Sequence, residues 1–192
     1  MGARVFSKCE NPKLTLEKSR SKMSQKKRPS QLSEYGTQML EKQKAKYMYG
    51  IRERQLANYV KKATAIQSGN PAESLFKKLE SRLDTVVYQL GFAKSHAFAR
   101  QLVGHGHIWV NGRTVTIPSY ETSPQDVITI RPQSKNKKVF ENSEERLKEH
   151  RVPAWLSFDA TKHEGKVLSA PITNSASETL INLGAILEFY SR

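Results

Sequence analysis

The stretch ARQLVGHGHIWVNGRTV, residues 99–115, gathers side chains that could do chemistry where an apolar stripe of helical spacing meets Gly-His-Gly-His. Arg100, His105, His107 and Arg113 could hold a metal ion, act as acid and base, or bind the phosphates of a nucleic acid. Zinc needs a third and usually a fourth ligand, and no nearby cysteine or paired acid supplies one. The ligand count favours phosphate binding, and we expect neither a metal nor a cofactor.

Motifs of nucleophilic catalysis are missing. The sequence holds no Gly-x-Ser-x-Gly, no phosphate-cradling glycine loop and no His-Glu-x-x-His. SRLDTVV at 81–87 resembles the segment around the catalytic aspartate of RNA pseudouridine synthases, but the Thr-Ser-Gly that follows in those enzymes is absent. We favour a structural role, in which Asp84 caps a helix from Ser81 with Arg82 exposed beside it. We therefore predict no catalytic residue.

The charge of the chain points to a polyanionic partner. Its 192 residues include 32 Lys and Arg against 18 Asp and Glu, a formal net charge of +14. Residues 1–62 carry 16 basic and 5 acidic side chains, so a net +11 lies in the first third. Such an excess is typical of proteins that bind nucleic acid.

The cellular compartment follows from cysteine usage and hydropathy. Cys9 is the only cysteine, so no intrachain disulfide can form and a reducing compartment fits. The longest apolar segment, LINLGAIL at 180–187, is too short to span a bilayer, and no secretory signal is recognisable. We therefore expect a cytoplasmic protein with no membrane partner.

The first part of the chain predicts a basic arm followed by amphipathic helices. Residues 1–36 have few large apolar side chains, which predicts an arm that stays flexible until it binds. From 37 to 78, apolar side chains recur at helical spacing, with a break at Gly50. Up to about residue 67, the polar faces hold only Glu41 and Glu53 as acids, and their basic residues predict phosphate contacts. These residues are Lys42, Lys44, Lys46, Arg52, Arg54, Lys61 and Lys62.

Two further helical patterns belong with this domain. Asn70 followed by Pro71 marks a helix start, and a second start near residue 81 predicts two helices in the apolar stripe that follows. Residues 177–192 carry another apolar pattern, which we interpret as a helix in preference to a strand. We assign this terminal helix to the domain of residues 37–78.

The segment 79–134 predicts a compact unit of helix, glycine joint and small sheet. Ser95 is a helix N-cap, and Gly104 would end that helix in a left-handed cap. Asn111-Gly112 is the strongest short hairpin signal, because both turn positions need positive φ. The strands around it would pair on the core side through Ile108, Val110, Val115 and Ile117.

This unit predicts a shallow basic groove that binds folded RNA by its shape and phosphate spacing. Donors gather at the start of the helix, and glycines after it let the backbone approach phosphate. We assign the groove to Arg82, Lys94, Ser95, His96, Arg100, Gln101, His105, His107, Asn111 and Arg113. His96 is expected to be mostly neutral at pH 7.

Residues 135–176 divide into two parts. The first is charged and predicts a linker that leads into a short helix at 141–150. The second predicts irregular or extended structure that packs on the preceding unit through Trp155 and Phe158.

Three segments carry a family resemblance. RLDTVVYQLGFAKSHAFARQLVGHGHIWVNGRTVTIPSY at 82–120 resembles the RNA-binding module named after the fourth protein of the small ribosomal subunit. LSEYGTQMLEKQKAKYMYGIRERQLANYVKKA at 32–63 and EFYSR at 188–192 resemble that ribosomal family itself. The module alone also occurs in RNA-modifying enzymes and synthetases, so the flanking segments favour the bacterial-type ribosomal family.

The resemblance implies an α+β fold, with an all-helical N-terminal domain and an inserted RNA-binding module of helices and a small antiparallel sheet. It implies a structural protein that binds small-subunit rRNA at a multi-helix junction, nucleates assembly and contributes to translational accuracy. Partners would include the fifth small-subunit protein and mRNA at the entry channel. The alternatives are an RNA-modifying enzyme and a free regulatory RNA-binding protein.

The sequence departs from the family pattern in three places. Members often have four zinc-binding cysteines, whereas Cys9 stands alone here, so zinc binding is not carried over. Lys94-Ser95-His96 replaces a usual Ser-Thr-Arg at the start of the recognition helix. Phe98 replaces a common acid, and Gly184-Ala185 replaces a polar pair.

Overall fold

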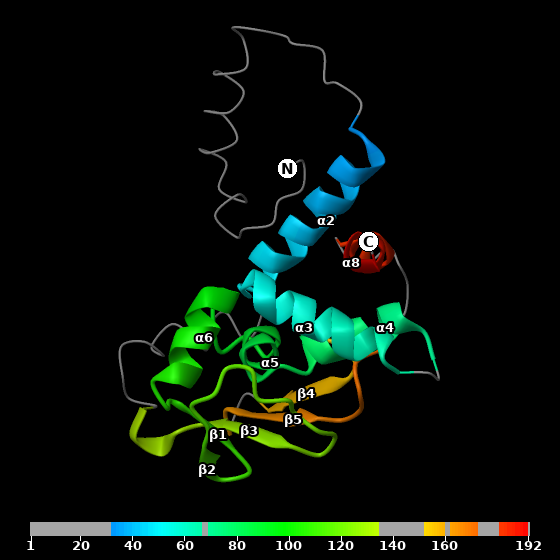
Figure 1. The fold of residues 1–192 in the computed structure, drawn as a ribbon. Helices are drawn as coiled ribbons and strands as arrows, with labels where there is room; N and C mark the ends of the chain where they lie inside the picture. Colours follow the sequence, from blue (N-terminus) through cyan, green and yellow to red (C-terminus); the bar gives the residue numbers. More distant parts are fainter. Residues whose placement is uncertain (1–31, 67–68, 135–151, 160–161, 173–180, 192) are drawn as a thin grey trace, which may run out of the picture. The chain divides into compact units, whose positions relative to one another are not determined.

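The computed structural model describes residues 32–66, 69–134, 152–159, 162–172 and 181–191 (Figure 1). They divide into two compact units. The first unit reaches Lys61 and also includes the C-terminal helix. The second unit begins at Lys62, and its last described residue is Ile172. The arm at 1–31 and the predicted helix at 141–150 lie outside the described residues. No described helix is both long and apolar enough to cross a lipid bilayer.

The first unit consists of the helices α2 (Glu34–Met48), α3 (Glu53–Thr64) as far as Lys61, and α8 (Leu183–Ser191). The Ser33 hydroxyl accepts a hydrogen bond from the Gly36 backbone N–H at 3.2 Å, so α2 begins inside the stretch that we assigned to the arm. Gly50 has a φ of +61° and separates α2 from α3, which confirms the predicted break. The terminal helix is confirmed over the described residues of α8.

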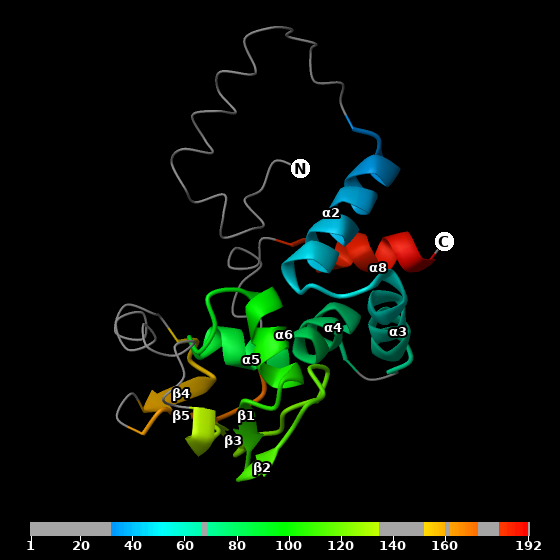
Figure 2. The same cartoon turned by 90° about the vertical axis from the view of Figure 1, so that its left-hand side faces the viewer.

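Helices α2 and α8 lie side by side (Figure 2). Gln38 Nε2 donates to Glu188 Oε2 at 3.1 Å, and the Asn182 backbone N–H donates to Glu41 Oε2 at 2.9 Å. The rings of Tyr35 and Phe189 add an aromatic contact with centroids 5.7 Å apart. Polar and aromatic contacts therefore tie the end of the chain to its first described helix.

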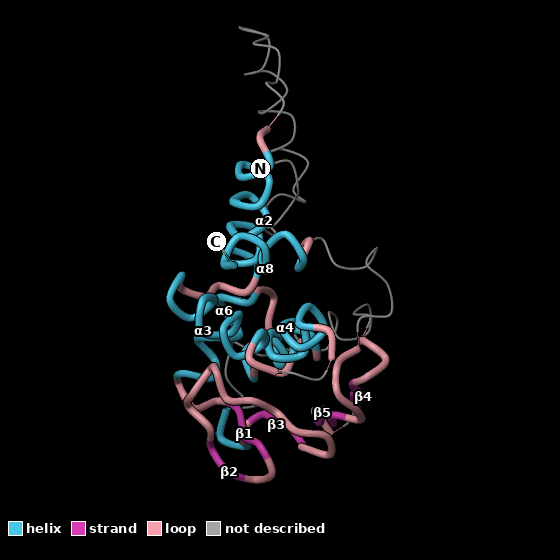
Figure 3. The backbone as a smooth tube through the Cα atoms, turned by 45° about the vertical axis from the view of Figure 1, so that its right-hand side comes forward, coloured by secondary structure: helices cyan, strands magenta, loops and turns pink. Residues whose placement is uncertain are grey.

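The second unit places three helices with an antiparallel sheet, drawn in magenta in Figure 3. The helices are α4 (Pro71–Glu80), α5 (Leu83–Gln89) and α6 (His96–Gly104). The strands are β1 (Ile108–Val110), β2 (Arg113–Thr114), β3 (Val127–Ile130), β4 (Leu156–Asp159) and β5 (Glu164–Val167), and a short 3-10 helix, η2 (Pro132–Ser134), follows β3. The strand order is β2-β1-β3-β5-β4. The predicted α+β class is confirmed, and α4 falls in this unit although we assigned residues 71–78 to the helical domain.

The core of the second unit lies between the sheet and the helices α5 and α6. The buried side chains are Leu83, Val86 and Val87 of α5, Leu90, Phe92 and Ala93 after it, Ala99, Leu102 and Val103 of α6, and Ile108, Val110, Ile128, Ile130, Leu156 and Val167 of the sheet. Trp155 and Phe158 pack against this cluster, as predicted. The segment around them forms the β4–β5 hairpin, a regular part of the sheet that the sequence pattern left as irregular or extended.

The Asn111-Gly112 turn has the predicted geometry, with φ values of +51° and +76°. The predicted pairing is confirmed for Val115, which donates its N–H to the Ile108 carbonyl at 3.4 Å and packs against the core cluster, and it is wrong for Ile117. A two-residue turn sets Val110 opposite Arg113, and β2 ends at Thr114, so Ile117 lies outside the sheet and is 59% exposed. The core partners of Ile108 and Val110 come instead from β3, where Ile130 and Ile128 lie opposite them.

The left-handed residue after α6 is Gly106, with a φ of +70°, and the prediction of Gly104 at this place is wrong. The Gly106 N–H donates to the Val103 carbonyl at 2.9 Å, and the His107 N–H donates to the Leu102 carbonyl at 3.0 Å. This pair of bonds is a Schellman motif, which satisfies the last carbonyls of the helix. The helix therefore extends further than the sequence pattern indicated, because Gly104 is its last residue and not the left-handed residue that ends it.

Gly165 on β5 is required by packing. A Cβ at this position would lie 2.7 Å from Leu90 Cδ2 and 3.0 Å from Leu90 Cγ, with Cδ1 closer still. Gly165→Ala is therefore expected to lower the free energy of unfolding by about 1–3 kcal/mol through overpacking. Urea unfolding followed by circular dichroism measures it.

Gly104→Ala is the matched control. A Cβ at Gly104 would meet open space, and alanine is the better helix former, so we expect no loss of stability and a gain of up to about 1 kcal/mol. Equal losses in the two variants would contradict the packing role of Gly165.

Candidate nucleic-acid interface

The start of α6 presents polar groups to solvent. The Ser95 hydroxyl accepts from the Phe98 backbone N–H at 3.3 Å, so the predicted N-cap is confirmed and this hydroxyl is engaged in the cap. Lys94 is exposed, and its Nζ lies 5.7 Å from the centre of the Phe98 ring. Gln101 and His105 are exposed further along, and so is Arg113 on β2. Helix α6 and the hairpin thus place cationic and polar groups on accessible surface within one unit.

Arg82 and Asp84 lie beneath this surface, and the prediction of an exposed Arg82 is wrong. Arg82 is 1% and Asp84 2% exposed. Arg82 Nε donates to Asp84 Oδ1 at 3.0 Å and Arg82 Nη2 donates to Oδ2 at 2.6 Å, a bidentate pair. Arg100 Nη1 lies 3.9 Å from the same Oδ2. Arg82 therefore supports the site from inside and is not a surface contact for RNA.

The predicted cap from Ser81 to Asp84 is also wrong. Arg82 is the N-cap residue of α5 and makes no side-chain cap bond. The Ser81 carbonyl accepts from the Thr122 N–H at 2.8 Å, and the backbones of Arg82 and Glu121 form an antiparallel bridge. Pairing with the chain 40 residues further on buries this joint, which a local capping pattern cannot predict.

His96 is neutral at pH 7, as expected. Burial and, to a smaller extent, the nearby positive charge of Arg82 together lower the pKa of its imidazole to about 4. Its ring lies 4.1 Å from that of Tyr88, centre to centre. His96 therefore contributes packing and no positive charge to the surface near neutral pH.

The remaining groove residues have distinct positions. His107 Nδ1 lies 2.9 Å from Ser134 Oγ, and its ring centre is 6.2 Å from that of the exposed His105. The side chain of Asn111 donates to Asp126 Oδ1 at 2.8 Å and accepts from the Val127 N–H at 2.9 Å, so it ties the turn to β3. Among the described residues, no three His, Cys, Asp or Glu side chains gather as a metal site.

The cations of α2 are engaged with acids. Lys42 is 8% exposed, its Nζ lies 2.8 Å from Glu53 Oε1, and it lies 4.4 Å from the centre of the Phe189 ring. Lys44 is paired with Glu41, and Lys46 Nζ lies 3.4 Å from Glu53 Oε2. The prediction of an open position is therefore wrong for Lys42. By contrast, the exposed cations of the predicted set are Arg52, Arg54, Lys61 and Lys62, on or just before α3.

Glu53 is the centre of this arrangement in the first unit. Besides Lys42 and Lys46, the Tyr190 hydroxyl donates to Glu53 Oε1 at 2.7 Å. Burial works to raise the pKa of Glu53, but the bonds from Lys42, Tyr190 and Lys46 outweigh it, and the net pKa is lowered. Burial and the Glu53 bond raise the pKa of the Tyr190 phenol. Sequence reasoning missed Glu53 and Tyr190 as partners, because 137 residues separate them.

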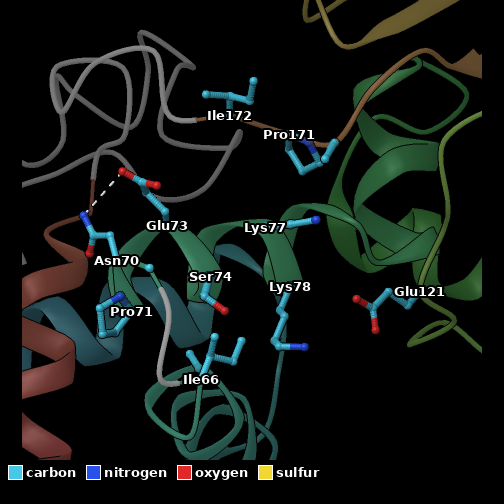
Figure 4. Close-up of a pocket in the computed structure, with 13 residues that line it drawn as sticks. Ile66, Asn70, Pro71, Glu73, Ser74, Lys77, Lys78, Glu121, Pro171 and Ile172 are labelled. Atoms are coloured by element: carbon cyan, nitrogen blue, oxygen red, sulfur yellow. Dashed lines mark hydrogen bonds between the residues drawn. The ribbon is translucent and has the colours of Figure 1, made fainter.

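A hollow of about 440 Å³ in the second unit has a different character (Figure 4). Lys77 and Lys78 of α4 line it together with the acids Glu73 and Glu121, and apolar Ile172 lies at its edge. Both signs of charge meet there, which disfavours phosphate binding. The surface of α6 and the hairpin remains the candidate.

This combination of α5, capped α6, Schellman joint and hairpin defines a protein with an S4 domain. The family model described as S4 domain matches residues 81–128. A second model, described as Ribosomal protein S4/S9 N-terminal domain, matches residues 2–80.

Relatives among known proteins cover most of the chain. Small ribosomal subunit protein uS4 of Chloroflexus aurantiacus is 48% identical over 167 residues, which is 86% of this chain and 80% of the relative. The proteins of the same name from Persephonella marina and Chlorobium limicola are 46% and 44% identical, over 85% and 86% of this chain and 80% of each relative. The chain therefore belongs to the uS4 family of small ribosomal subunit proteins, which are structural and not enzymes.

Glu53→Gln tests the network of the first unit. Because the pKa of Glu53 is lowered in the folded state, its stabilisation is complete above the ordinary value of 4.5 and is lost as the pH falls below it. The variant should be less stable than the parent by about 0.5–1.5 kcal/mol at pH 7, a modest value because Glu53 is partly solvated. Urea unfolding at several pH values measures the difference, which should shrink towards pH 3.5. A difference independent of pH would contradict the ionised role of Glu53.

Proposed function

We propose that this protein is a primary binder of small-subunit rRNA that holds a multi-helix junction and nucleates assembly of the subunit. One observation supports it above the others. From Thr85 to Tyr120, through α5, α6, β1 and β2, the chain carries no acidic residue, whereas Lys94, Arg100 and Arg113 reach solvent. A stretch that offers separated cations and no acid of its own attracts phosphates.

The start of α6 adds a second attraction for phosphate. Its first turn contains no acid, so the partial positive charge of the helix N-terminus is not compensated within the helix. Lys94 lies directly before this turn. A phosphate near Lys94 would therefore gain from the ammonium group and from the helix dipole together.

Helix α3 supports a second contact region. Arg54, Asn58, Lys61 and Lys62 are exposed polar or basic positions at helical spacing along it. Contacts to phosphate position a protein on RNA, and several weak ones together give high affinity. We propose that α3 and the surface of α6 and the hairpin both bind the junction.

The further roles that we propose concern partners. Leu32 just before α2 and Tyr35 and Met39 on it form a stripe of apolar side chains that are 59%, 49% and 42% exposed. Such a stripe suits a neighbouring protein, and the fifth small-subunit protein is our candidate. Contact with mRNA at the entry channel and a contribution to accuracy belong to the same proposal, as do the domain limits at 134 and 176.

Salt dependence tests the phosphate contacts. With about six to eight contacts, the logarithm of affinity for small-subunit rRNA should fall with the logarithm of salt with a slope of about −4 to −7. Arg113→Gln should reduce that slope by about one, since Arg113 is exposed. Lys42→Gln, which alters a buried cation, should leave the slope unchanged and lower stability instead. Filter binding over a salt series measures the slopes of both variants. A change of slope in Lys42→Gln with none in Arg113→Gln would contradict the assignment.

Order of addition tests the assembly role. Purified protein added to naked small-subunit rRNA should protect one junction from chemical probing before any other protein is present. Protein added after the other small-subunit proteins should yield fewer complete subunits in sedimentation. Protection scattered over the rRNA, or subunit yields independent of order, would contradict the nucleating role. Binding without sedimentation alongside small subunits would favour a free regulatory RNA-binding protein.

A further inference from the structure

The carboxylate of Asp84 lies under the proposed RNA surface and is nearly saturated. Oδ1 accepts from Arg82 Nε at 3.0 Å and from the Thr85 backbone N–H at 3.0 Å, and Oδ2 accepts from Arg82 Nη2 at 2.6 Å. A carboxylate offers about four acceptor sites. The one acceptor site left on the carboxylate lies towards Arg100, whose Nη1 is 3.9 Å from Oδ2. Asp84 itself is 2% exposed and cannot touch RNA.

The three charges divide unequally between interior and surface. Arg82 and Asp84 oppose each other inside the protein, with side chains 1% and 3% exposed, while the side chain of Arg100 is 37% exposed. The group carries one net positive charge. Arg100 is the member through which that charge reaches solvent.

We infer that Asp84 is a positioning residue for RNA binding. Arg82 fixes its carboxylate, and the carboxylate draws the guanidinium of Arg100 into one orientation at the surface while leaving its charge available to a phosphate. A side chain that is already ordered loses less freedom on binding, which for one arginine is worth roughly 2- to 10-fold in affinity. The inference rests on the proposed function, because it concerns how the same surface holds RNA.

Two simpler roles of Asp84 predict different results. If Asp84 acted only as a negative charge near phosphates, its removal would strengthen RNA binding. If it acted only in folding, its removal would weaken binding equally with and without Arg100. The positioning role alone predicts weaker binding that depends on Arg100.

A double-mutant cycle on the full chain separates these roles. The parent, Asp84→Asn, Arg100→Gln and the double variant are bound to small-subunit rRNA of Chloroflexus aurantiacus transcribed in vitro, at 10 °C and with folding checked by circular dichroism. Asp84→Asn should weaken binding roughly 2- to 10-fold in the parent and have no effect in the Arg100→Gln background. Glu121→Gln is the control, because it removes an exposed carboxylate from the same unit, and its affinity should equal or exceed that of the parent.

Asparagine at position 84 leaves Arg82 buried without an opposing charge, so this variant can fail to fold. NMR relaxation of the arginine Nε–H groups in the free parent then tests the positioning role of Asp84. Arg100 should be clearly more ordered than Arg113, which contacts no carboxylate among the described residues. Equal mobility of the two, unchanged or tighter binding by Asp84→Asn, or an equal loss in both backgrounds would overturn the inference. Failure of the parent to bind rRNA would overturn the proposed function instead, and the relaxation measurement needs no RNA.

Discussion

The buried pair of Arg82 and Asp84 is the interaction on which the rest of the second unit depends. Taking two charges out of water costs several kcal/mol each, and only close geometry with further hydrogen bonds offsets that cost. The bidentate contact and the Thr85 N–H supply both. The pair therefore persists only while α5, the joint before it and the chain near residue 121 keep their places, which makes it a sensitive link between core and surface.

The same pair explains how charges are sorted in this unit. The carboxylate of Asp84 is used inside, and the positive charge of Arg82 holds His96 in its neutral form by adding to the effect of burial. Around α6 and on the hairpin, positive charge that reaches solvent then comes from Lys94, Arg100 and Arg113, which are separated along the chain. The surface consequently carries a few defined cations, a pattern that suits recognition of phosphate spacing better than a dense cluster would.

In the first unit the arrangement is the reverse, because acidic side chains pair with the cations of one helix. Glu41 and Glu53 occupy the lysines of α2, and Tyr190 from the end of the chain completes the contacts of Glu53. Basic residues of α2 thus stabilise the packing of helices, whereas those of α3 stay exposed. This division between paired and exposed cations suits a member of the uS4 family, because a ribosomal protein must fold its helices and still present cations to RNA.

The sequence by itself determined the features that depend on neighbours within a few residues: the caps at Asn70 and Ser95, the Asn111-Gly112 turn, the break at Gly50 and the excess of positive charge. It also determined the family, because matching segments are read directly from residue order. Only the tertiary structure decided which cations are buried. Lys42 and Arg82 look like their exposed neighbours in the sequence, and their burial depends on Phe189 and on the chain near Glu121, which are distant along the chain. The sequence did not predict the register of β2 or the β4–β5 hairpin for the same reason. Strand pairing is fixed by contacts between segments and not by the pattern within one segment.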